Sequence, residues 1–193
     1  RIQYRTRSGK AALFAFNEGV EAVQKVLAGS DWNIEWDGET HALQIEDLRL
    51  NEHYIRPIKE PVQYKMYRWL ALNDKSYDWY MNAEGGIIER LPLLQKKLNN
   101  HLMATLWGMG WEKPTPDFRV EAQIEQILRT QTMKYHEAHY LAFDIYFTAN
   151  ILIPSGMGIG KGVSHGYGWQ VPAKGDDGFQ TEKKRSKLKV PIF

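Results

Sequence analysis

The stretch "VEAQIEQILRTQTMKYHEAHYLAFDIYFTANILIP", Val120 to Pro154, contains two long runs in which apolar and polar residues alternate. Such alternation is typical of β-strands that bury one face. Only a few polar residues separate the two runs, so we predict a long β-hairpin. The hairpin decides the fold, because the elements on either side of it have to complete the same sheet and cover it.

The elements flanking this hairpin predict the rest of one domain. "VQYKMYRWLAL", residues 62–72, is strand-like, and "PLLQKKLNNHLMATLW", residues 92–107, predicts a helix with Pro92 in its first turn. One stripe of this helix is apolar: Leu94, Leu98, Leu102 and Leu106. After the hairpin, "GMGIGKGVSHGYGW" leaves room only for a turn or a very short helix before a last strand in "YGWQVP". The resulting order is the βαββαβ ferredoxin-like unit.

The first part of the chain predicts a shorter version of the same unit. Residues 1–7 and 11–16 are strand-like, and Asn17 can cap a helix over residues 18–28 whose stripe is Val20, Val23 and Leu27. Residues 42–55 predict a further strand, preceded by a loop or short edge strand. This order lacks the opening strand and helix of the unit, and because the chain begins at Arg1 within a strand-like run, we expect upstream sequence to be missing.

We therefore predict an α+β protein with two tandem ferredoxin-like (RRM-like) domains. The first, over residues 1–58, is incomplete, and the second, over residues 62–193, carries the glycine-rich loop at 156–168. Pro57 and Pro61 bracket a predicted linker.

Composition narrows the function classes. With 193 residues, 43% of them hydrophobic, the chain can bury substantial cores. It has no cysteine, which excludes disulfides and thiolate metal sites and fits a cytoplasmic location, and no apolar run is long enough to span a membrane. The net charge is only +2, but basic residues gather at both ends: Arg1, Arg5, Arg7, Lys10, Lys183, Lys184, Arg185, Lys187 and Lys189. This placement suggests a polyanionic partner, although a solvated tail explains the second group equally well.

The glycine-rich stretch does not match the common nucleotide-binding loops. Ser155 stands where a Walker loop needs its first glycine, and Gly162 follows Lys161 where that loop needs a hydroxyl residue. Dinucleotide fingerprints starting at Gly158 or Gly160 fail at their last position. Two interpretations stay open, a hairpin shaped by glycine without a ligand and a loop that binds a polynucleotide.

Two segments resemble a known family. "RIQYRTRSGKAALFAFNEGVEAVQ", residues 1–24, and "IGKGVSHGYG", residues 159–168, are similar to the first half and the glycine-rich loop of CRISPR-associated repeat RNA endoribonucleases, the Cas-six family, and most similar to its subtype-B branch. The resemblance implies two RRM-like folds that hold CRISPR repeat RNA over a basic surface and beside the loop. It also implies cleavage without a metal, in which the ribose 2′-OH attacks the adjacent phosphorus and leaves a 2′,3′-cyclic phosphate and a 5′-OH.

The resemblance also suggests site residues. The family's usual catalytic histidine lies on the helix that we expect upstream of Arg1, so the catalytic residue stays unassigned. His165 is the best candidate within this chain, although a structural hydrogen bond within the loop explains this histidine equally well. Glycine N–H groups and Lys161 can meet phosphates, and Tyr167 and Trp169 can either pack within the protein or stack on a base. The expected RNA contacts are Gly158, Gly160, Lys161, Gly162, Ser164, His165, Gly166, Tyr167, Gly168, Arg5 and Arg7. No cofactor and no metal are expected.

Other histidines have plainer explanations. We expect His101 to pack beside the apolar helix stripe, and His136 with His139 to contact solvent or RNA rather than a metal, because a third ligand is not in view. The alternative function is a non-catalytic RRM-like scaffold that holds RNA in a CRISPR effector complex. Beyond the RNA, the expected partners include other CRISPR effector or adaptation proteins, and the resemblance allows a homodimer.

Overall fold

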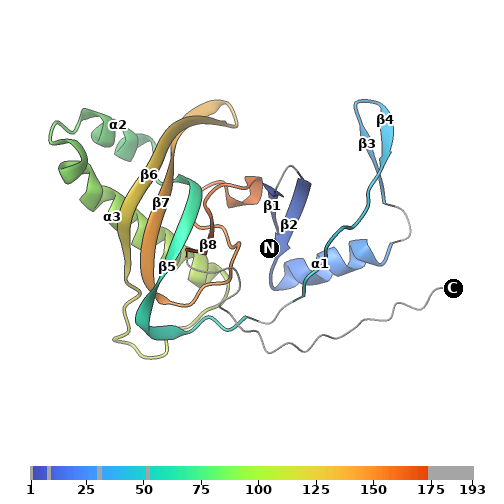
Figure 1. Ribbon diagram of the computed structural model, residues 1–193, viewed down its shortest axis with the longest axis horizontal. Helices are drawn as coiled ribbons and strands as arrows, with labels where there is room; N and C mark the ends of the chain where they lie inside the picture. Colours follow the sequence, from blue (N-terminus) through green and yellow to red (C-terminus); the bar gives the residue numbers. More distant parts are fainter. Residues whose placement is uncertain (1, 8–9, 30–31, 51–52, 174–193) are drawn as a thin grey trace.

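The computed structural model describes residues 2–7, 10–29, 32–50 and 53–173. Arg1 and the basic residues of the C-terminal cluster, Lys183 to Lys189, lie outside the described residues. Two units follow one another along the chain, and Figure 1 shows the smaller N-terminal unit beside the sheet of the larger one.

The larger unit is built on one antiparallel sheet. Its strands are β5 (Pro57–Leu70), β6 (Ala122–Tyr135), β7 (Ala138–Ile151) and β8 (Trp169–Pro172), in the order β6-β7-β5-β8. Tyr135 pairs with Ala138 across the turn, so the predicted long hairpin is confirmed as β6–β7. The first strand of the unit lies between the third and the fourth, as in a ferredoxin-like fold.

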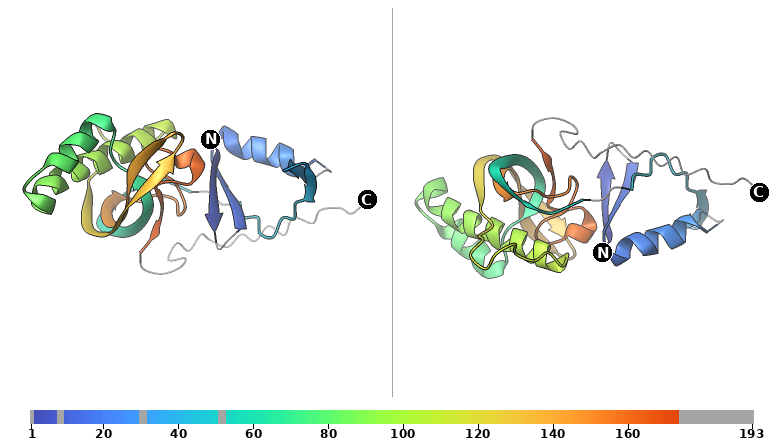
Figure 2. Two further views of the ribbon diagram at one scale, coloured as in Figure 1. Left: turned by 90° about the horizontal axis from the view of Figure 1, so that it is seen from above. Right: turned by 90° about the horizontal axis from the view of Figure 1, so that it is seen from below.

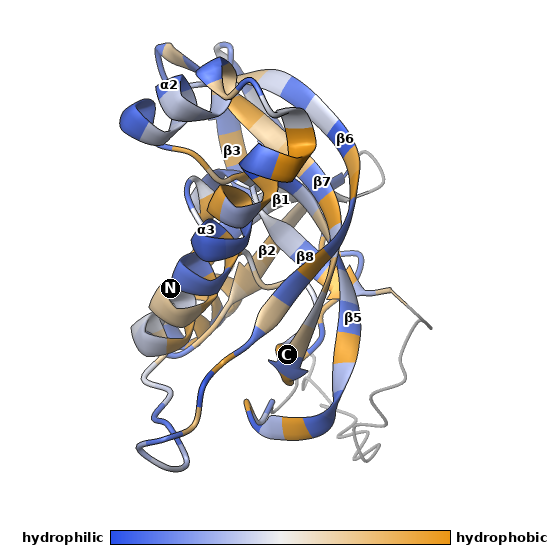
Figure 3. Ribbon diagram, turned by 90° about the vertical axis from the view of Figure 1, so that its left-hand side faces the viewer, coloured by the Kyte–Doolittle hydropathy of each residue, from blue (hydrophilic) through white to orange (hydrophobic). Residues whose placement is uncertain are grey.

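Two helices cover the inner face of this sheet: α2 (Asp74–Asn82) and α3 (Gly86–Gly108). The predicted leucine stripe of α3 is fully buried in one core with Tyr64, Met66, Ile145 and Phe147. Figure 3 shows hydrophobic and hydrophilic residues alternating along β5 and β6, which is why only one face packs on the helices.

Two details of this helical layer differ from the prediction. The polar segment between the predicted strand and helix, to which the sequence pattern assigned no element, forms α2. This helix begins with a reciprocal cap: Ser76 N–H donates to Asn73 Oδ1 at 3.0 Å, and Asn73 N–H donates to Ser76 Oγ at 2.9 Å. Helix α3 begins at Gly86, so Pro92 lies inside it. The carbonyl that loses its partner at Pro92 belongs to Ile88, which is 85% exposed and open to hydration.

The linker predicted between Pro57 and Pro61 is wrong, because β5 already starts at Pro57. The pairing with β7 shifts register between Pro57 and Val62, and β8 reaches only Tyr64 to Tyr67. This end of β5 is therefore an irregular edge, where prolines without an N–H are tolerated.

The N-terminal unit consists of β1 (Ile2–Arg7), β2 (Lys10–Ala15), α1 (Glu18–Leu27), β3 (Asn33–Trp36) and β4 (Glu39–Ala42). The two strands and the helix at its start are as predicted. The strand predicted over residues 42–55 is wrong for the described residues 43–50 and 53–55, which form no strand. Instead, an Asp37–Gly38 turn closes the β3–β4 hairpin, as Asp-Gly pairs commonly do.

The two units meet where β1 packs on a short 3-10 helix, η1 (Val163–His165), which stands where the sequence predicted a turn or very short helix. Figure 2 shows β1 beside η1 in both views. Gly158 N–H donates to Gln3 Oε1 at 2.9 Å in a buried hydrogen bond. Asn17 does not cap α1 as expected, because its Nδ2 donates to Met109 O, 3.2 Å away at the end of α3. Among the described residues, no helix combines the length and the apolar character needed to cross a membrane.

His101 is a packing residue, as predicted. Its Nδ1 accepts a hydrogen bond from Trp69 Nε1 at 3.1 Å, and the two rings meet edge to face. Burial, and secondarily the charge of Lys97, lowers the pKa of His101 to about 4. The imidazole is therefore neutral in the folded protein at pH 7.

The lowered pKa of His101 predicts that the stability of the protein depends on pH. The unfolded chain takes up a proton on His101 near pH 6.5 and the folded chain only near pH 4, so the free energy of unfolding should fall as the pH is lowered between these values. His101→Gln should flatten this dependence by about 1.4 kcal/mol per pH unit relative to wild type. Urea unfolding at several pH values measures it, with the exposed His41→Gln as the control. Equal slopes in wild type and His101→Gln would contradict the prediction.

Candidate functional site

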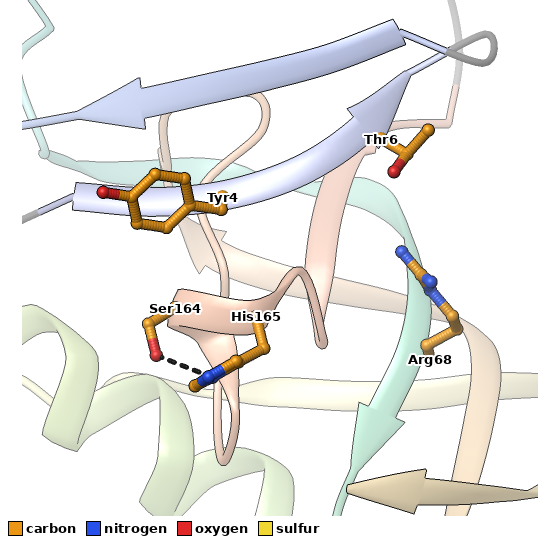
Figure 4. Close-up of a pocket in the computed structure, with 5 residues that line it drawn as sticks. All are labelled: Tyr4, Thr6, Arg68, Ser164 and His165. Carbon is orange, nitrogen blue, oxygen red and sulfur yellow. Dashed lines mark hydrogen bonds between the residues drawn. The ribbon is translucent and has the colours of Figure 1, made fainter. Parts of the chain in front are cut away.

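An open pocket of about 450 Å³ lies at the junction of the two units. Figure 4 shows its lining: Tyr4 and Thr6 from β1, Arg68 from β5, and Ser164 and His165 from η1. The glycine-rich loop that stands in place of the unit's second helix thus forms one wall, and the N-terminal unit forms the other.

Arg68 enters this pocket because β5 is irregular at that point. The pairing with β7 shifts register between Met66 and Trp69, and Arg68 has a positive φ of 51°. Its backbone N–H donates to Asp144 Oδ1 at 2.7 Å, and its Nη2 donates to Gly166 O at 3.0 Å. We did not identify Arg68 from the sequence; the only signal is the break in alternation after Met66.

His165 is exposed on η1, with its Nδ1 3.1 Å from Ser164 Oγ. Its ring centroid lies 5.3 Å from that of Tyr135 and 5.4 Å from that of His136, at the turn of the β6–β7 hairpin. The fold thus brings together two histidines that are distant in the sequence.

His139, three residues after His136, is not among the residues that line the pocket. His139 lines a separate cavity of about 120 Å³ with Asp74 and Tyr77. Within the described ranges, no three His, Cys, Asp or Glu side chains lie together as a metal site would require. The described residues thus provide no third metal ligand beside His136 and His139.

Lys161 lies on the other side of Tyr135. Its Nζ donates to the Tyr140 hydroxyl at 2.8 Å and lies 4.0 Å from the centroid of the Tyr140 ring. The side chain remains exposed, so its ammonium group is accessible to a phosphate.

The glycines of the loop permit close packing, and three of the N–H groups expected to meet phosphates are hydrogen-bonded within the protein instead. The N–H of Gly158 is bound by Gln3, that of Gly166 donates to Val163 O and that of Gly168 donates to Arg68 O. At Gly160, with φ 99°, a Cβ would lie 2.9 Å from His101 Nδ1. Gly162 and Gly166 flank η1, both with positive φ.

Tyr167 is also part of the packing. It is 9% exposed, its hydroxyl donates to Lys134 O at 2.9 Å, and it packs with Leu70. Of the two alternatives for Tyr167, the structure therefore favours packing, and its ring is not placed to stack on a base. Arg5 and Arg7 belong to β1 by their backbone pairing, but their side chains lie outside the described part of the structure.

Comparison with known families agrees with this architecture. The family model described as the Cas6b C-terminal domain matches residues 57–172, and the Cas6b N-terminal domain matches residues 1–54. The chain belongs to the Cas6b family. The boundary between the two matches coincides with the start of β5 in this Cas6b-family chain. No curated protein matches its sequence.

Solved structures support the fold. A Cas6b crystal structure aligns with a TM-score of 0.74 at 19% identity, over 89% of this chain and 76% of that one. A structure of the CRISPR RNA processing endoribonuclease Cas6b aligns with a TM-score of 0.64 at 21% identity, over 89% and 80%. Csf5, a CRISPR-Cas type IV Cas6 crRNA endonuclease, aligns with a TM-score of 0.56 at 15% identity, over 89% and 66%. The predicted fold class, α+β with tandem ferredoxin-like domains, is confirmed.

The packing role of the glycines predicts a difference between two substitutions. Gly168 has φ 66°, and a Cβ there would lie 2.1 Å from Ile159 O, whereas Gly38 has φ 79° with nothing within 4 Å. Gly38→Ala should cost about 1 kcal/mol of stability for its backbone conformation alone. Gly168→Ala should cost about 1–3 kcal/mol more, because the loop has to move. Chemical denaturation of both variants measures this, and equal losses would show that the loop accommodates a side chain freely.

Proposed function

We propose that this Cas6b-family chain processes CRISPR repeat RNA as a metal-independent endoribonuclease. Membership of the Cas6b family supports the class of substrate, as does the likeness to a CRISPR RNA processing endoribonuclease and a crRNA endonuclease. The observation that carries the proposal is that His165 and Arg68 line the same open pocket.

The pocket offers the groups that RNA self-cleavage chemistry needs. A base removes the proton of the 2′-OH, the 2′ oxygen bonds to phosphorus, and the bond to the 5′ oxygen breaks as an acid protonates that oxygen. The products are a 2′,3′-cyclic phosphate and a 5′-OH. Charge that builds up on the phosphorane oxygens needs a nearby cation.

We assign these roles from the geometry. His165 is the candidate for the general base or acid, because imidazoles transfer protons near neutral pH and this one is exposed in the pocket. His136, 5.4 Å away between ring centroids, and the Tyr4 hydroxyl are the candidates for the complementary role. Arg68 supplies the cation: its backbone N–H is bonded to Asp144, and its guanidinium is bonded to Gly166 O, without the substrate.

The first test of this proposal is cleavage itself. The protein should cut repeat RNA in EDTA, and RNA with a single 2′-deoxy nucleotide at the cleavage site should survive. His165→Ala should slow single-turnover cleavage by about 10²- to 10⁴-fold, the usual contribution of a proton-transfer group. His139→Ala, on the same hairpin as His136 but outside the pocket, is the matched control.

Each alternative outcome has a distinct meaning. Cleavage of the deoxy substrate or a requirement for magnesium would rule out the 2′-OH mechanism. An unchanged rate in His165→Ala would place the catalytic groups elsewhere. Tight binding of repeat RNA without any cleavage by the wild-type chain would favour the scaffold function.

The second test concerns Lys161. Lys161→Ala should weaken binding to repeat RNA of any sequence and reduce the slope of log affinity against log salt by about 0.7, the contribution of one phosphate contact on a single strand. Fluorescence anisotropy over a salt series measures this slope. Lys75→Ala, an exposed lysine on α2, should leave it unchanged. An unchanged slope in Lys161→Ala would mean that its contact with Tyr140 is structural only.

A further inference from the structure

The outer face of the larger sheet carries a compact group of aromatic rings around one lysine, which we call the outer-face cluster: Lys65 and Tyr67 on β5, Tyr146 on β7 and Trp169 on β8. Lys65 pairs with Tyr146 across β5–β7, and Tyr67 pairs with Trp169 across β5–β8. The four side chains therefore lie on three neighbouring strands at adjacent positions.

This cluster is on the face opposite α2 and α3. Side chains alternate between the two faces of a strand, and Tyr64, Met66, Ile145 and Phe147, which flank the cluster along β5 and β7, are fully buried in the core with the α3 leucines. The members of the outer-face cluster are only half-buried, and so are its polar neighbours Gln63 and Thr148.

The geometry of the cluster is that of a stack beside a cation. The rings of Tyr67 and Trp169 are 4.4 Å apart between centroids and 16° from parallel. Lys65 Nζ lies 4.9 Å from the centroid of Tyr67 and 5.7 Å from that of Tyr146. Large rings on an otherwise polar sheet face are not required to fill the core, since α2 and α3 bury the other face.

We propose that the outer-face cluster stacks an unpaired base of single-stranded RNA, with Lys65 contacting an adjacent phosphate. Every base has a π-face that can extend an aromatic stack, and a lysine nearby attracts the backbone. The proposal rests on the proposed function only for RNA as the ligand. It does not depend on catalysis in the pocket.

The position of the cluster relative to the pocket favours single-stranded RNA over double-stranded RNA as the ligand. Tyr67 directly precedes Arg68 in β5. An RNA segment bound at Arg68 therefore lies next to Tyr67. Bases within a duplex are stacked on each other and present only their edges in the grooves, so they cannot extend a protein stack. The ligand is therefore an unpaired segment adjoining the nucleotides in the pocket.

The test compares two probes that share a backbone. One is a labelled oligouridine of about 12 nucleotides, and the other is its abasic equivalent, which keeps the phosphates and lacks the bases. Tyr67→Leu should weaken anisotropy-measured binding of the oligouridine by about 5- to 100-fold and binding of the abasic probe much less. Tyr67→Phe should retain wild-type binding. Tyr77→Leu, on α2, is the matched control.

Circular dichroism melts establish that each variant is folded, and Tyr146→Leu provides a second variant should Tyr67→Leu unfold. The proposal is overturned if the folded variants bind oligouridine as wild type does, or lose the same factor on both probes, which would make the cluster a stability element or a protein contact. Single-turnover cleavage at saturating repeat RNA separates this result from the proposed function. A base-specific loss with unchanged cleavage rate supports the cluster alone, whatever the fate of His165→Ala.

Discussion

The hydrogen bonds of Arg68 hold together the central strand and the glycine-rich loop. Its N–H donates to Asp144 on β7, its carbonyl accepts from Gly168 N–H, and its Nη2 donates to Gly166 O. These bonds fix an irregular residue with a positive φ, which would otherwise be unfavourable for a side chain as large as arginine. Because Arg68 anchors the loop, its position sets the position of η1, against which β1 packs.

The loop can sit this close because its glycines let its backbone approach the neighbouring elements. Gly160 lies against His101 and Trp69, and Gly158 bonds directly to Gln3 of the other unit. A helix in this position would place a layer of side chains between the sheet and the N-terminal unit. The thin loop instead lets residues from β1, β5 and η1 line one pocket.

Periodicity predicted the parts of this fold that are regular. The β6–β7 hairpin and the leucine stripe of α3 follow from local patterns that burial enforces, whereas the turn or very short helix expected at η1 was predicted from the limited length of chain before β8. Helix α2 was missed because its apolar pattern is weak, although the sequence contains Asn73 and Ser76 at the spacing of a capping box. The pocket could not be predicted in the same way. Arg68 depends on a bulge, and the approach of His136 to His165 depends on how the hairpin tip meets the loop.

The bulge has a second effect that links the pocket to the outer-face cluster. In a regular strand, successive side chains point to opposite faces, so neighbours in sequence do not serve the same ligand. At the register shift after Met66 this alternation of side chains is interrupted. Tyr67 stacks on Trp169, and the neighbouring Arg68 donates to Gly166 O and lines the pocket. Both residues lie on the central strand of the sheet: Tyr67 pairs with Trp169 of β8, and the backbone of Arg68 is hydrogen-bonded to Asp144 and Gly168. If RNA binds both sites as we propose, the backbone of β5 between Tyr67 and Arg68 sets the spacing between the stacked base and the phosphate at Arg68.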